Sequence, residues 1–126
     1  MSSAEMNGTP LEALRPTTTG HPGLDAFAQF QAIVAKQPDA MPAWYQLGRT
    51  CVFANARHAE GEAALKRYLA HQPGVQDPPL AAAHWRLGML YELMARVADA
   101  RAQYQAALKF EPDHAEAKAA LRRLKG

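Results

Sequence analysis

The stretch HWRLGMLYELMARVADARAQYQAALKFEP, residues 84–112, decides the fold of this chain. Its apolar residues recur every three or four positions, which is the period of an amphipathic helix. Small residues, Gly88 and Ala100 among them, stand where two neighbouring helices would have to approach closely. The stretch therefore predicts most of a helix pair, spanning about residues 80–94 and 97–110.

The same pattern occurs once more, earlier in the chain. Residues 43–53, AWYQLGRTCVF, align with residues 83–93, AHWRLGMLYEL, so that Leu47-Gly48 falls on Leu87-Gly88. Glycine inside a helix costs about 1 kcal/mol relative to alanine. The same glycine occurs at the equivalent position of two helices, which is best explained by the close approach of a neighbouring helix. Self-similarity of this kind indicates a repeat architecture.

The rest of the chain adds helices of the same period and no alternating strand pattern. They are predicted at about residues 24–37, 42–55, 58–71 and 113–124, with prolines between most of them. The sequence thus predicts an all-α protein of about six helices, in which short connections make neighbouring helices antiparallel. Residues 1–20 are rich in Pro, Gly and Thr, and we expect a flexible leader there, ahead of a helical domain at 21–126.

These residues resemble the tetratricopeptide repeat (TPR), a helix-turn-helix unit of about 34 residues. Residues 80–112 carry its pattern through Leu87, Gly88, Tyr91, Ala100, Tyr104, Ala107 and Pro112. Residues 41–74 match less closely, residues 24–37 match the second half of a unit, and residues 113–125 resemble a capping helix. The resemblance implies a short right-handed superhelix of about two and a half repeats.

The chain departs from the family pattern in several places. His84 stands where the motif has tryptophan, and the unit at 41–74 needs one additional residue between its helices. The loop around Pro78-Pro79 is five residues longer than the corresponding earlier connection. Asp113 is expected to cap the N-terminus of the last helix.

Composition and motifs argue against most other classes of protein. The 14 basic and 12 acidic residues nearly balance, which disfavours a dedicated nucleic-acid binder. There is no signal peptide and no apolar run of membrane-spanning length, so we expect a soluble, cytoplasmic protein without a membrane partner. The five histidines are scattered and Cys51 has no second thiol, so we predict no metal, no cofactor and no catalysis. An enzyme subunit that uses His58 or His71 stays an alternative.

The TPR resemblance implies a groove lined by the first helix of each pair, which receives extended peptides or helices. When the family's groove positions are aligned with the two repeats of this chain, they fall on seven candidate partner-binding residues: Tyr45, Arg49, Val52, Phe53, Trp85, Met89 and Glu92. Leu93 is a further candidate. Aromatic and arginine side chains dominate binding energies, and methionine adapts to irregular ligands. In the competing interpretation, Tyr45 and Trp85 complete the core between units instead.

The leading functional hypothesis is an adaptor that binds a peptide or helix of a protein partner. The family's clamp for a C-terminal carboxylate is not expected, because Tyr45, Arg49 and Ala82 replace its Lys and Asn residues and Arg86 alone matches. The alternative is a segment that self-associates or packs on another domain through an open apolar face at Phe27 and Phe30. We expect a monomer or a weak homodimer.

Overall fold

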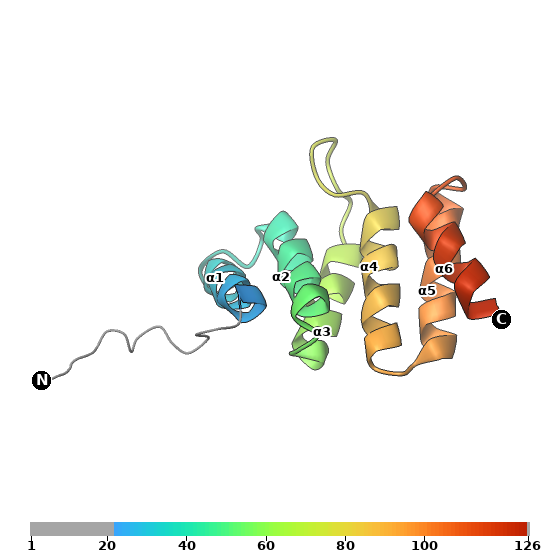
Figure 1. The fold of residues 1–126 in the computed structure, drawn as a ribbon. Helices are drawn as coiled ribbons and strands as arrows, with labels where there is room; N and C mark the ends of the chain where they lie inside the picture. Colours follow the sequence, from blue (N-terminus) through green and yellow to red (C-terminus); the bar gives the residue numbers. More distant parts are fainter. Residues whose placement is uncertain (1–21, 126) are drawn as a thin grey trace, which may run out of the picture.

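The structure, a computed structural model, describes residues 22–125 as a row of six helices without a strand in that range (Figure 1). The helices are α1 (Pro22–Lys36), α2 (Met41–Ala54), α3 (His58–Leu69), α4 (Leu80–Leu93), α5 (Val97–Phe110) and α6 (Ala115–Lys125). The prediction of an all-α fold with six helices is confirmed. The leader predicted at residues 1–20 lies outside the described residues.

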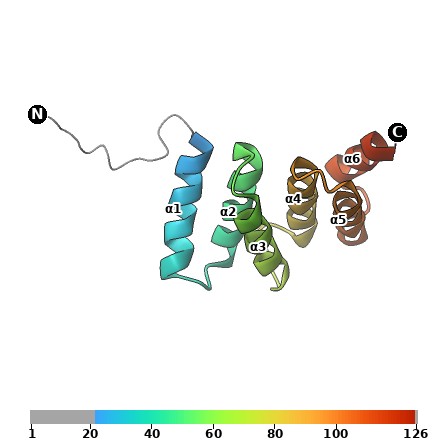
Figure 2. The same cartoon turned by 90° about the horizontal axis from the view of Figure 1, so that it is seen from below.

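Helices that follow one another in sequence pack as antiparallel hairpins. The most extensive contacts join α4 to α5, α2 to α3 and α1 to α2, and α2 also contacts α4. Figure 2 shows the helices following one another along the row, with α1 at one end and α6 at the other. The contact between α2 and α4 brings the first helices of two hairpins side by side.

Gly48 and Gly88 allow each hairpin to close. A Cβ atom on Gly48 would lie 2.3 Å from Cγ of Leu65, and one on Gly88 would lie 2.6 Å from Cε1 of Tyr104. No side chain fits at such distances, so both helices need a residue without a Cβ at this phase. The close approach inferred from the repeated glycine is therefore present, with a large α3 or α5 residue filling the space.

The core runs through both hairpins and ends at α6. Tyr68 and Tyr104 are its largest fully buried residues. Each hydroxyl is satisfied: Tyr68 donates to the carbonyl of Pro78 at 2.5 Å, and Tyr104 donates to Oε1 of Glu92 at 2.6 Å. The hydrogen bond from Tyr68 to Pro78 holds the long loop between α3 and α4 against the core. A buried tyrosine with a partner stabilises the fold, whereas an unpaired hydroxyl would cost free energy.

Two expectations need correction. The face expected to lie open at Phe27 and Phe30 is closed at Phe27, which is only 3% exposed and has the Arg57 guanidinium 5.2 Å from its ring centroid, whereas Phe30 is half-buried. The cap of α6 is His114 rather than Asp113, because Nδ1 of His114 accepts the backbone N–H of Ala117 at 3.1 Å. Imidazole can serve here because its unprotonated nitrogen is an acceptor.

None of the helices formed by residues 22–125 is long and apolar enough to cross a membrane. The longest, α1, has 15 residues, whereas a span needs about 20 apolar ones. The amphipathic faces of these helices are instead used for packing against one another. This packing places α2, α4 and α6 around one pocket.

Candidate partner-binding groove

A pocket of about 600 Å³ lies between α2, α4 and α6. From α2 and α4 it is lined by Val52, Phe53, Trp85, Met89, Glu92 and Leu93, and from α6 by Glu116, Ala119, Ala120 and Arg123. Tyr104 of α5 also reaches it. We call this pocket the groove. Its volume lies within the usual range of ligand pockets, roughly 300–1,000 Å³.

The groove contains five of the seven residues selected by repeat register, together with Leu93. These five are Val52, Phe53, Trp85, Met89 and Glu92. The contact between α2 and α4 brings them together, although they are more than 30 positions apart in the sequence. Because these five residues meet on one surface, a single partner segment could contact all of them.

Tyr45 does not line the groove. It is 6% exposed, its ring centroid lies 5.5 Å from that of Tyr68, and its hydroxyl accepts a hydrogen bond from Nε of Arg86 at 3.3 Å. The next hairpin therefore covers Tyr45, and its place is in the core. Trp85, at the equivalent position, is half-buried and lines the groove.

Arg49 also lies outside the groove lining, but it stands next to the groove. Its guanidinium carbon is 4.5 Å from the ring centroid of Phe53, and the guanidinium carbon of Arg86 is 5.2 Å from the same centroid. Arg86 additionally lies 4.1 Å from the ring of Trp85. Cations over aromatic faces are attracted by the ring quadrupole. One edge of the groove is thus aromatic and positively charged.

The opposite wall of the groove is closed by a charged pair. Arg123 donates to both carboxylate oxygens of Glu92, at 2.6 and 3.1 Å, and Tyr104 donates to Oε1 at 2.6 Å. The Arg123 hydrogen bonds, helped by that of Tyr104, hold the pKa of Glu92 below its usual value. Glu92, a candidate partner-binding residue, is therefore already bound within the chain and joins α4 to α5 and α6.

Between these two edges the surface is apolar. Phe53 is 58% exposed and Leu93 is 41% exposed, which are high values for large apolar side chains. Ala119 and Ala120 keep the α6 side shallow, and Met89 is half-buried between the aromatic edge and Glu92. Such a surface can bury apolar side chains of a partner, with an orientation set by the charges at its edges.

The contribution of α6 was not predicted from the sequence. Glu116, Ala119, Ala120 and Arg123 are spaced by three or four positions, so they share one face of the helix. That spacing was available in the sequence. The spacing does not indicate that this face of α6 points toward α4, because the orientation of α6 depends on how it packs against α5.

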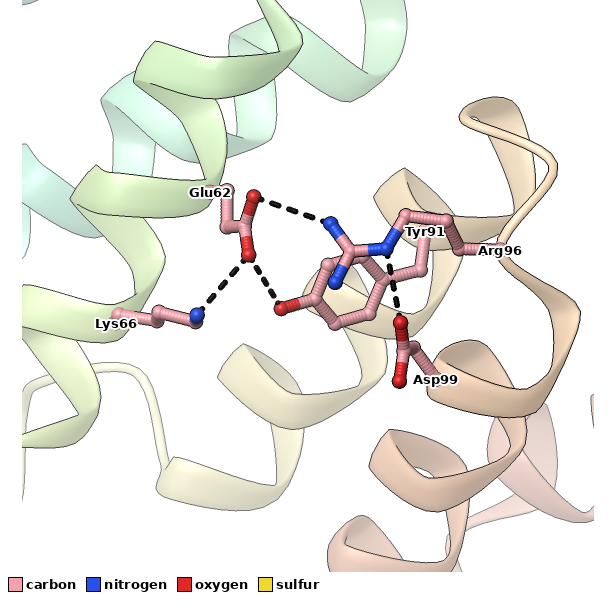
Figure 3. A network of polar contacts seen from close by, with 5 residues as sticks. All are labelled: Glu62, Lys66, Tyr91, Arg96 and Asp99. Carbon is pink, nitrogen blue, oxygen red and sulfur yellow. Dashed lines mark hydrogen bonds and ion pairs between the residues drawn. The ribbon is translucent and has the colours of Figure 1, made fainter.

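A second polar network lies on α3, α4 and the start of α5, and it does not belong to the groove (Figure 3). Glu62 accepts hydrogen bonds from Tyr91 at 2.7 Å and from Arg96 at 3.4 Å, and it pairs with Lys66 at 3.0 Å. Arg96 also pairs with Asp99 at 2.8 Å. The Tyr91 hydroxyl is the main cause that lowers the pKa of Glu62. Every group has a partner, so this network joins the two hairpins.

The residues considered for catalysis are dispersed. Burial raises the pKa of the Cys51 thiol to about 12, so it is not a thiolate at neutral pH. His58 contacts the amide oxygen of Asn55 at 2.8 Å, and His71 contacts the Tyr68 carbonyl at 2.7 Å. Within the part of the chain that the structure describes, no three His, Cys, Asp or Glu side chains gather as a metal site.

Comparisons of the chain with protein-family models, with curated proteins and with solved structures found no match. The groove itself is the feature of the chain that bears on function. Its features are an exposed apolar surface, a cationic aromatic edge and a neutralised Glu92–Arg123 wall.

Proposed function

We propose that this chain is a TPR-like protein-interaction module that binds a segment of a partner protein in the groove. The observation that carries the proposal is that residues chosen by repeat register meet on one pocket with an exposed aromatic centre. Contiguous exposed apolar surface on a soluble domain is typical of interaction sites. The tetratricopeptide assignment is part of the proposal, and the paired glycines of two helical hairpins support it.

The binding energy would come from apolar burial on Phe53, Trp85, Met89 and Leu93. Full burial of one leucine or phenylalanine side chain is worth about 1.5–3 kcal/mol. A pocket of about 600 Å³ accepts a few side chains rather than the flat face of a globular domain. A short extended or helical segment is therefore the form of partner that suits it.

A peptide selection tests the proposal. Random dodecapeptides displayed on phage would be selected on the full chain, and the recovered sequences would be synthesised and titrated by fluorescence anisotropy. We expect Trp85→Ala to abolish measurable binding while the helicity seen by circular dichroism stays unchanged, because Trp85 is half-buried on the groove. The proposal is wrong if no peptide is recovered, or if the recovered peptides bind the folded Trp85→Ala variant as well as the original chain.

A further inference from the structure

We infer that the partner segment is acidic: an Asp or Glu side chain faces Arg49 and Arg86, while an apolar neighbour in the same segment enters the groove. This inference rests on the proposed function and specifies the chemistry of the segment. It follows from the charges at the aromatic edge, which form no ion pair with a carboxylate of residues 22–125.

Two guanidinium groups lie against one exposed ring. Their carbons are 4.5 Å (Arg49) and 5.2 Å (Arg86) from the centroid of Phe53. Both arginines are half-buried, so each has lost part of its hydration. A segment that crosses the Phe53 ring therefore meets two cations, which repel each other and which a carboxylate would stabilise.

Neither arginine has a carboxylate partner among residues 22–125. A guanidinium carries five N–H donors. Arg86 uses two of its donors within the chain, toward the Tyr45 hydroxyl at 3.3 Å and the Met89 sulfur at 3.9 Å, the second a weak contact. Several donors of this group thus remain for an oxygen acceptor.

Two other arginines that join helices, Arg96 and Arg123, are paired with carboxylates, whereas Arg67 packs on Trp44 and donates to the Pro38 carbonyl. Arg96 is paired with Asp99 at 2.8 Å and Arg123 with Glu92 at 2.6 Å. Among residues 22–125, no carboxylate pairs with the two arginines at the Phe53 edge. A carboxylate of the partner segment can therefore pair with them.

The other side of the groove limits the kind of anion. Glu92 and Glu116 line it together with the apolar side chains. A nucleic-acid strand carries a phosphate at every nucleotide, but the cation on this side, Arg123, is already paired with Glu92, and such a strand would leave the apolar surface unused. A peptide can place one or two carboxylates at the arginines and apolar side chains beyond them.

The test uses matched synthetic dodecapeptides that share the same leucine and phenylalanine positions. In three sets, acetylated at the N-terminus and amidated at the C-terminus, the variable positions carry Asp or Glu, Asn or Gln, or Lys. A fourth set is the neutral one with a free C-terminal carboxylate, and a single-stranded RNA dodecamer is the fifth probe. We expect the acidic set to bind the full chain roughly tenfold more tightly than the blocked neutral set, with a difference that shrinks at high salt.

Variants of the chain assign this preference to the two arginines. We expect Arg49→Met and Arg86→Met each to weaken binding of the acidic peptides by roughly fivefold and to leave binding of the neutral peptides unchanged. Arg67→Met is the matched control, because Arg67 lies 4.8 Å from the Trp44 ring, donates to the Pro38 carbonyl and does not line the groove. The control should retain the full acidic preference.

The outcomes separate this inference from the proposed function. If no peptide of any set binds, both are overturned. If acidic and neutral peptides bind the groove equally well, the proposed function stands and the acidic partner is overturned. The same holds if the basic set binds best, or if the free C-terminal carboxylate restores binding of the neutral set. Tightest binding by the RNA would overturn the acidic peptide and point to another class of partner.

Discussion

Tyr45 and Trp85 occupy equivalent positions in α2 and α4, yet Tyr45 is buried and Trp85 is half-buried. Tyr45 packs against Tyr68 of its own hairpin and is covered by Arg86 of the next hairpin. Beyond the α4–α5 hairpin, residues 22–125 form the single helix α6, and the ring of His114, just before α6, lies 5.7 Å from that of Trp85. Equivalent positions thus differ in burial because their neighbours along the row differ.

This difference predicts unequal effects on stability. Tyr45→Ala should lower the free energy of unfolding by about 3 kcal/mol, the usual cost of removing a large buried side chain. Trp85→Ala should cost less, since Trp85 is half-buried. Urea denaturation followed by circular dichroism measures both. A Tyr45→Ala variant as stable as the unmodified chain would mean that Tyr45 is exposed in solution.

At the scale of helices, the boundaries were predictable and the contacts between helices were only partly so. Prolines and the 3.6-residue period predicted α1 to α6 closely, because these signals are local. The close approach at Gly48 and Gly88 was also predictable, since a costly glycine returned at one phase. The α6 side of the groove and the Glu62 network could not be predicted, because they depend on how side chains from different hairpins meet.

The Glu62 network connects the two hairpins, and its contribution to the free energy of unfolding should depend on pH. Its neighbours hold the pKa of Glu62 below the value expected in the unfolded chain, so the stabilisation is present above about pH 4.5 and is lost as the pH falls through the lowered pKa. Glu62→Gln should therefore lower the free energy of unfolding by about 1 kcal/mol at pH 7. At pH 3 the difference should be much smaller.

Urea denaturation at the two pH values measures this effect. Glu111→Gln is a suitable control, since Glu111 is exposed on the chain and takes part in no ion pair within residues 22–125. It should change stability little at either pH. Equal losses for Glu62→Gln at pH 7 and pH 3 would contradict an electrostatic role for Glu62.

At the scale of the whole molecule, a row of helical hairpins creates a pocket that no single hairpin has. Val52 and Phe53 come from one hairpin, Trp85 and Met89 from the next, and α6 closes the far side. The helical architecture and five of the residues from α2 and α4 that line the pocket could be selected from the sequence, because both follow from the repeat. The identity of a partner is not encoded in the repeat, and only the charges at the edge of the groove restrict its chemistry.

The groove is tested most directly by two phenylalanines of equal exposure. Phe53 and Phe110 are each 58% exposed, but Phe53 lines the groove and Phe110 stacks on His84 outside it. For a peptide selected on the unmodified chain, isothermal titration calorimetry should show roughly tenfold or greater loss of affinity for Phe53→Ala and no loss for Phe110→Ala. Equal affinities of both variants, or a greater loss for Phe110→Ala, would contradict binding in the groove.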